Sequence, residues 1–352
     1  MKQQNNYLVM ITSPRLNKDG FGGVYKYEGV KMKRFICTIL LMSLMLSLFG
    51  CQSDKPSPDD KEAKKASFEI AEEFMSKIVT EDFCPEEYMG RKPDVTYGKM
   101  EKARYYSDTC GRERNVNVVL PDGYSEDKEY PVLYVLHGAF GNEDSMANMD
   151  YNSKNVSSQI IIGNMIADGT AKDMIIVFPY IFASREKEAY TDNTIEEVKG
   201  YDNFVNDLVK DLMPFIEDNY SIAKGKDNTA VFGFSMGGRE ALAIGLAHPD
   251  KFGYIGGACP APGLIPGKDW LFDHPGQYTE DELVFEEEAP YLIMIASGGS
   301  DGMSGEFPEK YHKLFDEHGV SNVWYTVPNS GHGEPAISSL TYNFAKNLFK
   351  AK

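Results

Sequence analysis

One stretch decides the fold of this chain: Thr229-Ala-Val-Phe-Gly-Phe-Ser-Met-Gly-Gly-Arg239. Residues 230–232 form a short apolar run, which is typical of a strand covered on both faces. The residues that follow match the pattern G-x-S-x-G around Ser235, and a segment rich in good helix formers continues to His248-Pro249. The stretch therefore predicts a strand, a sharp turn and a helix, with the serine at the tip of the turn.

The predicted turn explains why these residue types occur together. A serine between strand and helix holds its hydroxyl clear of the sheet, and Gly233 and Gly237 remove side chains that would collide there. The N–H of Met236 lies at the start of the helix, where it can face a developing oxyanion. We therefore predict that Ser235 is a nucleophile and that Met236 supplies one half of an oxyanion hole.

The bare pattern also matches by coincidence, because a second copy surrounds Ser300 in Gly298-Gly-Ser-Asp-Gly302. This copy follows a strand-like run as well, but residues 303–308 do not begin a helix. Structural context separates a motif from a coincidence, so Ser300 is the weaker candidate. For Ser235 itself, the alternative is a tight glycine-rich turn without chemistry.

The composition is that of an ordinary globular protein. The chain has 352 residues, of which 42% are hydrophobic and 25% charged, and this is enough for one large domain. The net charge of −17 argues against nucleic acid or anionic lipid as a partner, since both bind basic surfaces. No group of cysteine, histidine and carboxylate residues has metal-ligand spacing, so we predict no metal.

The N-terminus carries a targeting pattern. Residues 1–31 are polar and precede a better start at Met32, so we interpret them as a mis-start or a disordered extension. Residues 32–50 combine basic residues with an apolar run too short for a typical membrane span, and Cys51 follows. This segment resembles a bacterial lipoprotein signal. The resemblance implies lipid attachment at Cys51 and an extracytoplasmic protein anchored to the bacterial cell membrane through that lipid alone; a plain transmembrane anchor is the alternative.

Three further ranges differ in composition. Residues 51–66 are polar and contain prolines and charges, which predicts a flexible tether. Residues 67–94 begin with apolar side chains at helical spacing, so they are interpreted as an N-terminal helical prefix that packs on the main domain. Residues 95–352 are predicted to form the catalytic domain.

This domain alternates between strand-like and helix-like segments. The first two strand-like segments have no helix between them, which predicts an antiparallel edge. The rest predicts an α/β fold with a mostly parallel eight-stranded sheet and helices on both faces. The predicted strands are 95–106, 115–120, 132–136, 174–178, 229–233, 254–258, 291–296 and 322–327, and the predicted helices are 157–167, 202–220, 236–247, 309–318 and 337–349.

A serine nucleophile needs a base, and the base needs an orienting acid. Among six histidines, His332 lies in a glycine-flanked loop between the last strand and the last helix, where a loop can reach Ser235. Asp301 follows the preceding strand directly and is better placed than Glu306 or Asp316. The resulting order of serine, aspartate and histidine is that of the α/β-hydrolase fold. For His332, the alternative is a turn residue that caps the following helix.

The segment after the third strand supplies the other half of the oxyanion hole. In Leu136-His-Gly-Ala139, the N–H of Ala139 would point at the carbonyl oxygen together with that of Met236. His137 is then a structural residue that holds the turn and takes no part in the chemistry.

Residues from about 97 to 349 resemble the esterase D and feruloyl esterase group of α/β-hydrolases, carbohydrate esterase family 1. The resemblance implies ester hydrolysis or acyl transfer through an acyl-enzyme without a cofactor, and it leaves the substrate open. The matching pieces are Pro131-Val-Leu-Tyr-Val-Leu-His-Gly138, Leu212-Met-Pro-Phe-Ile-Glu-Asp-Asn-Tyr220, Gly233-Phe-Ser-Met-Gly-Gly-Arg239, His248-Pro-Asp-Lys-Phe252 and Gly331-His332.

Two long loops are candidates for the substrate walls. Residues 180–201 include Tyr180 and residues 260–290 include Trp270, and both side chains could stack on a phenolic acid or a sugar ring. Local packing of each loop on the domain is the alternative. Cys84 and Cys110 could pair outside the cell, whereas Cys259 follows a strand and is expected to be a core thiol.

These observations favour a surface-anchored serine esterase that acts on feruloyl or acetyl esters of plant cell-wall polysaccharides. The alternatives are a siderophore-type or general carboxylesterase or acyltransferase, and a non-enzymatic surface binding protein of the same fold. The complete serine, aspartate and histidine set argues against the last of these.

Overall fold

The computed structural model describes residues 58–147 and 157–352. The chain divides into two units, Met1–Lys55 and Pro56–Lys352, and only the second contains described residues. The predictions for residues 1–31, for the signal at 32–50 and for Cys51 therefore lie outside the described residues. No helix within the described ranges is long and apolar enough to cross a membrane.

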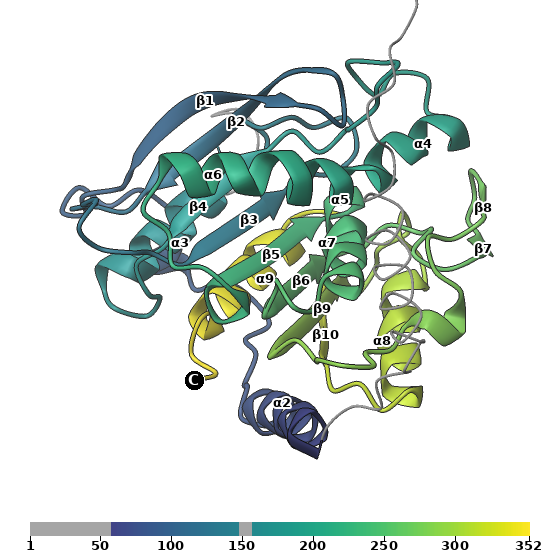
Figure 1. The fold of residues 1–352 in the computed structure, drawn as a ribbon. Coiled ribbons are helices and arrows are strands. Elements are labelled where there is room, and N and C mark those ends of the chain that lie inside the picture. The colour runs from purple at the N-terminus through teal and green to yellow at the C-terminus, as the bar shows by residue number, and fades with distance from the viewer. Residues whose placement is uncertain (1–57, 148–156) are drawn as a thin grey trace, which may run out of the picture. The chain divides into compact units, whose positions relative to one another are not determined.

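An eight-stranded sheet forms the centre of this unit (Figure 1), and its strand order is β1-β2-β4-β3-β5-β6-β9-β10. β1 pairs antiparallel with β2 and β2 pairs antiparallel with β4, while all the later neighbours are parallel. The predicted α/β-hydrolase fold with its antiparallel edge is therefore confirmed. The strands are β1 (Lys99–Ser107), β2 (Arg112–Leu120), β3 (Val132–Leu136), β4 (Ile175–Pro179), β5 (Thr229–Phe234), β6 (Tyr254–Ala258), β9 (Leu292–Gly298) and β10 (Val323–Val327).

Alternate residues of each strand supply two separate cores, because successive side chains point to opposite faces of a sheet. In β3, Val132, Tyr134 and Leu136 belong to one core, whereas Leu133 and Val135 belong to the other. Helical segments cover both cores. Among those on the first core are α4 (Ile195–Asp202), the π-turn η2 (Leu208–Leu212), α6 (Met213–Asn219), α7 (Met236–Ala247) and α8 (Phe307–Glu317), and among those on the second are α2 (Pro58–Ser76), α3 (Ser158–Ala167) and α9 (Ala336–Asn347).

The first helix begins earlier than the sequence predicts. Residues 58–66 were assigned to a flexible tether, but α2 begins at Pro58. Proline is favoured at the first helical position. Ala71 and Met75 of this helix are buried in the second core, and the backbone N–H of Ile293 in β9 lies 3.5 Å from the Met75 sulfur.

The helix predicted at 202–220 is interrupted. The structure has a short α5 (Phe204–Asp207), then η2, then α6. Pro214 has no N–H to donate to the preceding turn, so the regular hydrogen-bond ladder cannot continue through this position. A wider π-turn precedes it, as is frequent near functional sites.

The pairing of Cys84 with Cys110, which the sequence left open, does not form in the structure. Both thiols are free and buried. Cys84 packs in the second core and Cys110 in the first, so the sheet lies between them. The positions of the two cysteines along the chain do not reveal this separation, because it depends on which face of the sheet each segment covers.

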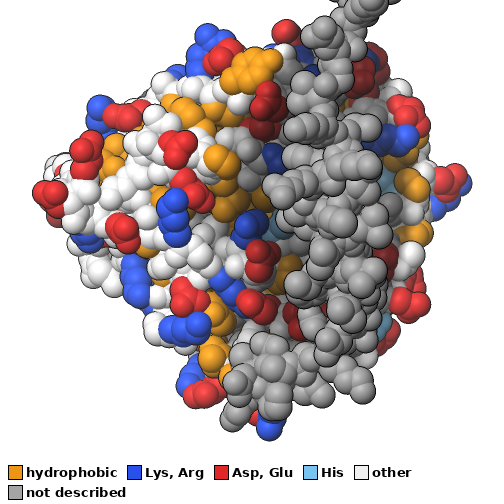
Figure 2. Space-filling model, in the orientation of Figure 1, with side chains coloured by type: hydrophobic (Ala, Val, Ile, Leu, Met, Phe, Trp, Pro, Cys, Tyr) orange, Lys and Arg blue, Asp and Glu red, His pale blue; other side chains and the backbone are white. Residues whose placement is uncertain are grey.

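Acidic and basic side chains are interspersed over the described part of the surface seen in Figure 2. Several form exposed ion pairs, such as Lys128 with Asp173 at 2.9 Å and Lys224 with Glu217 at 2.7 Å. Exposed pairs of this kind contribute about 0–1 kcal/mol each. The stability of the unit therefore rests mainly on its two apolar cores.

Candidate active site

A strained turn holds Ser235 between β5 and α7. Its backbone has φ 54° and ψ −115°, a conformation rare for residues other than glycine. The Ser235 N–H donates to the carbonyl of Ala258 at 2.9 Å, and the Ser235 carbonyl accepts from the N–H groups of Arg239 and Ala261, both at 3.0 Å. These three bonds stabilise the turn and leave the hydroxyl at its tip.

The two motif glycines allow α7 to begin against the end of β3. A Cβ on Gly237 would lie 2.4 Å from the Leu136 carbonyl oxygen and 2.5 Å from that of His137. A Cβ on Gly233 would lie 2.4 Å from the Gly237 carbonyl. Both positions are therefore closed to any side chain, as the G-x-S-x-G pattern predicts.

The structure brings Ser235, His332 and Asp301 together in one line of hydrogen bonds. The Ser235 Oγ lies 2.9 Å from Nε2 of His332, and Nδ1 of His332 lies 3.0 and 3.1 Å from the two carboxylate oxygens of Asp301. The imidazole also packs on the Phe234 ring, with 4.9 Å between ring centroids. The three side chains come from the loops after β5, β9 and β10, which all end at the same edge of the sheet.

Asp301 is held as a carboxylate. Burial raises the pKa of its carboxyl, but the hydrogen bond with His332 and the N–H groups of Ser304 and Met303 outweigh that effect and lower the pKa from 3.8 to about 2. The anion can therefore orient the imidazole and stabilise its protonated form.

Two residues behind the imidazole were not predicted to belong to the site. The Ser304 hydroxyl donates to the carbonyl of Cys259 at 2.8 Å and lies 3.4 Å from Nδ1 of His332. Cys259 is fully buried, as expected of a core thiol, and its sulfur lies within 4.8 Å of ligand atoms of Asp301 and His332. Burial raises the pKa of Cys259 to about 12, so the thiol keeps its proton.

Residues 137–141, called the oxyanion loop here after their predicted role, lie beside the serine. A Cβ on Gly138 would lie 3.4 Å from that of Ser235, so this backbone passes directly beside the nucleophile. Ala139, the predicted donor, follows and is partly buried, and Met236 is buried at the start of α7. Phe140 adopts a positive φ of 62°, and its N–H donates to the Tyr201 hydroxyl at 3.2 Å.

His137 holds this loop in place through hydrogen bonds. Its Nε2 accepts the backbone N–H of Ile181 at 3.0 Å, so its Nδ1 carries the proton and donates to the Gly138 carbonyl at 2.7 Å. Burial lowers the pKa of His137 to about 4, which keeps the ring neutral. These contacts agree with the structural role expected for His137.

The rival serine lies outside this arrangement. Ser300 is exposed in the turn after β9, where its N–H donates to the Ser330 carbonyl at 2.8 Å. Helix α8 does not begin until Phe307. Asp301, the next residue along the same turn, is the one that contacts His332.

The two predicted substrate residues differ in exposure. Tyr180 is half-buried and stacks on His137, with 5.6 Å between ring centroids. Trp270 is 67% exposed between the short strands β7 (Gly267–Lys268) and β8 (Asp273–His274). Asp269 fixes this hairpin by accepting the N–H groups of residues 271 and 272 and by contacting His274 at 2.9 Å.

A network of buried charged side chains connects α7 to the loop that carries Trp270. Arg239 contacts Glu240 and Asp202, each at 2.5 Å, and also donates to the Pro262 carbonyl. Gln277 donates to the same two carboxylates. Sequence reasoning missed this network because Asp202 and Gln277 lie far from Arg239 along the chain.

Comparison with known proteins agrees with the fold. The family model described as "Putative esterase" matches residues 107–291, which is more than half of the chain. The chain belongs to this esterase family. A solved ferulic acid esterase of carbohydrate esterase family 1 from Anaeromyces mucronatus is 41% identical, with 78% of this chain and 99% of that chain covered and a TM-score of 0.74.

Two curated relatives are longer proteins. An endo-1,4-β-xylanase/feruloyl esterase of Xylanibacter ruminicola is 32% identical over 62% of this chain and 27% of its own length. An esterase of Mycobacterium tuberculosis is 33% identical over 42% of this chain and 29% of its own length. The chain therefore spans less than a third of these relatives. The matches confirm the predicted resemblance to feruloyl esterase-like α/β-hydrolases.

We expect the Asp301 carboxylate to stabilise the fold in a pH-dependent way. Because its pKa is lower in the folded protein, the stabilisation is complete above a pH of about 4 and is lost as the pH falls toward about 2. The difference in the free energy of unfolding between wild type and Asp301→Asn should shrink over this range when measured by urea denaturation. Glu286→Gln, at an exposed acid, serves as the control. A difference that stays constant with pH would contradict the expectation.

Proposed function

We propose that this protein is a serine esterase that hydrolyses carboxylic esters through an acyl-enzyme. The observation that carries the proposal is the line of hydrogen bonds from Ser235 through His332 to Asp301, with the serine on a strained elbow. Membership of the esterase family supports the same reaction.

The first half of the reaction follows from this geometry. The Ser235 Oγ attacks the ester carbonyl carbon while Nε2 of His332 takes the hydroxyl proton. The oxygen that becomes negative is stabilised by the N–H groups of Met236 and Ala139. When the tetrahedral intermediate collapses, the bond to the alcohol breaks, and His332 gives its proton to the departing oxygen.

Water completes the cycle. His332 takes a proton from water, whose oxygen attacks the acyl carbon, and the proton then returns to Ser235 as the acid leaves. Asp301 stays ionised throughout and holds Nδ1 of His332, so that Nε2 always faces the serine.

The proposed substrates are feruloyl or acetyl esters of plant cell-wall polysaccharides. The relative from Anaeromyces mucronatus is a ferulic acid esterase solved with ferulic acid, and the Xylanibacter ruminicola relative joins a feruloyl esterase to a xylanase. Exposed apolar side chains on three loops that follow strands of the sheet, namely Phe140, Trp270 and Met303, favour an aromatic acyl group.

The proposed location is the outer side of a bacterial cell membrane, with the protein anchored by a lipid on Cys51. The support comes from the sequence alone: the basic residues at 33 and 34, the apolar run at 35–49 and the cysteine that follows. An exported enzyme of this kind could act directly on polymeric substrate outside the cell.

Ser235→Ala and His332→Ala should each lower kcat by a factor on the order of 10⁴–10⁶, with the double variant little worse, because the pair acts as a unit. Asp301→Asn should lower kcat by less than Ser235→Ala but still by orders of magnitude. Aryl acetate hydrolysis measures kcat, and mass spectrometry maps the organophosphate adduct. Ser300→Ala is the matched control and should keep its activity. An adduct on Ser300, or full activity in Ser235→Ala, would overturn the assignment.

Trp270→Ala should raise KM for methyl ferulate by about three- to tenfold, as expected for the loss of one aromatic contact. KM for a small acetate ester should change little, because acetate cannot reach the indole. Phe83→Ala, which also removes an exposed aromatic ring, is the control. Equal effects on both esters would reject the contact between Trp270 and the acyl group and would leave the esterase assignment intact.

Cys51→Ser should leave the protein without a lipid. Mass spectrometry of the wild-type N-terminus in a bacterial host, together with partition into detergent, measures this directly. Wild-type protein that carries no lipid and retains residue 1 or 32 at its N-terminus would contradict the proposed anchoring. A lipid on wild type that persists in Cys51→Ser would move the attachment to another residue.

A further inference from the structure

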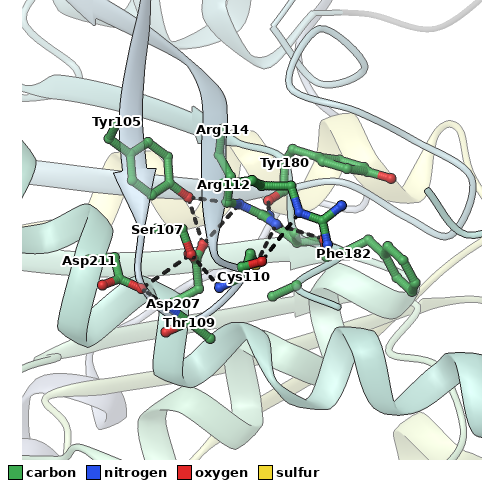
Figure 3. Close-up of polar contacts among 12 residues, drawn as sticks. Tyr105, Ser107, Thr109, Cys110, Arg112, Arg114, Tyr180, Phe182, Asp207 and Asp211 are labelled. Atoms are coloured by element: carbon green, nitrogen blue, oxygen red, sulfur yellow. Dashed lines mark hydrogen bonds and ion pairs between the residues drawn. The ribbon is translucent and has the colours of Figure 1, made fainter. Parts of the chain in front are cut away.

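A buried arginine connects the edge of the sheet to the loop that follows β4 (Figure 3). Arg114 on β2 is 6% exposed, and its guanidinium donates to the backbone carbonyls of Phe182, at 2.9 Å, and of Tyr180. The guanidinium also lies over the Tyr180 ring, 5.4 Å from its centroid. One side chain thus fixes both the backbone of residues 180–182 and the ring of Tyr180.

The other side of Arg114 is fixed in turn. Its Nε lies 3.1 Å from the Tyr105 hydroxyl and 3.3 Å from the Asp207 carboxylate, which is fully buried on α5. The Tyr105 hydroxyl donates to the same carboxylate at 2.6 Å. These contacts hold the planar guanidinium in one orientation, whereas a lysine ammonium in its place would not be held in this way.

The segment that Arg114 holds is the one that holds the oxyanion loop. Ile181 lies between the two fixed carbonyls, and its N–H donates to His137 Nε2 at 3.0 Å. His137 donates to the Gly138 carbonyl at 2.7 Å, and Tyr180 stacks on the imidazole ring. A continuous chain of contacts therefore runs from the buried ion pair to the backbone beside Ser235.

The positive charge of Arg114 also acts on His137, in addition to the chain of contacts. His137 must be neutral, because its Nε2 accepts a hydrogen bond. Burial lowers the pKa of His137 most strongly, the hydrogen bond to the Gly138 carbonyl opposes this, and the positive charge of Arg114 lowers the pKa further. Arg114 therefore favours the protonation state that the loop requires.

Stability alone does not account for this arrangement. Desolvation makes a buried ion pair a poor source of net stability compared with apolar side chains of similar volume. One carboxylate oxygen of Asp207, Oδ1, has no hydrogen-bond partner among the described residues, which adds to the cost. An apolar pair could not donate the two hydrogen bonds that hold the backbone carbonyls at 180 and 182.

We propose that Arg114 is a positioning residue for the oxyanion hole: through the loop at 180–182 and His137, it sets the position of the Ala139 N–H relative to Ser235. The inference rests on the proposed esterase function. An oxyanion donor stabilises the transition state more than bound substrate, so its displacement should appear in kcat and leave KM unchanged.

The test compares wild type with Arg114→Met, using active sites counted by organophosphate titration. We expect kcat per titrated site to fall by roughly 10- to 100-fold, less than for removal of an oxyanion donor, with KM within about twofold. Binding of phenylboronic acid, which becomes tetrahedral on the serine, should weaken by a similar factor, while binding of ferulate should not change. Arg114→Lys keeps the charge without the fork and should lose most of the same kcat.

Two further variants keep the test decisive if Arg114→Met does not fold. Arg114→Met/Asp207→Leu leaves no unpaired buried charge and should show the same fall in kcat. His137→Gln breaks the chain at its other end and should also lower kcat with little change in KM.

Asn164→Ala is the matched control for stability. Asn164 is fully buried on α3, beneath the opposite face of the sheet, where it donates to the carbonyls of Tyr88 and Gly90. This variant should lower Tm without a change in kcat per titrated site.

The proposal would be overturned if a folded Arg114 variant had the same kcat per titrated site and the same boronate affinity as wild type. If neither Arg114 variant folds, the same result in His137→Gln would overturn it. Wild-type protein that hydrolyses no ester and takes up no organophosphate would instead reject the esterase function, so the two failures are distinguishable.

Discussion

The close contact between the start of α7 and the end of β3 is the constraint on which the site depends. Gly237 lies so near the carbonyls of Leu136 and His137 that no side chain fits between them. This contact turns the chain sharply at Ser235 and costs about 1–3 kcal/mol of backbone strain. The same contact brings the loop that follows β3 beside the serine. The nucleophile and the proposed oxyanion donors therefore owe their proximity to a single packing contact.

Two buried arginines support this arrangement from different directions. Arg239 follows the nucleophile in the sequence and connects α7 to the loop that carries Trp270, through Glu240, Asp202 and Gln277. Arg114 lies on a strand near the sheet edge and acts on the loop before α4. In both cases, an expensive buried charge fixes backbone carbonyls of loops that have little regular structure of their own. Loop position, more than net stability, is what these charges provide.

The sequence predicted local features well where the residue types fit only one kind of local structure. The eight strands of the main sheet lie where apolar runs indicated them, and α7 has the predicted bounds. Predictions failed where the outcome depended on distant packing. The helix at 202–220 became three segments, in which Asp207 contacts Tyr105 on β1 and Asp211 contacts the turn between β1 and β2. Cys84 and Cys110 seemed free to pair along the chain but lie in separate cores.

By itself, the sequence determined the α/β fold, the elbow at Ser235 and the choice of His332 and Asp301, because a parallel sheet brings the ends of its strands to one edge. Glycines and prolines marked the turns, and alternating apolar runs marked the strands. Only the tertiary structure revealed Ser304, Cys259, the Arg239 network and the contacts from Arg114 to His137. Apart from the contact of Arg239 with its neighbour Glu240, these contacts join residues far apart in the chain, and the residue types alone do not mark them. Burial and direction give them their roles, and both arise only when the sheet and its helices have packed together.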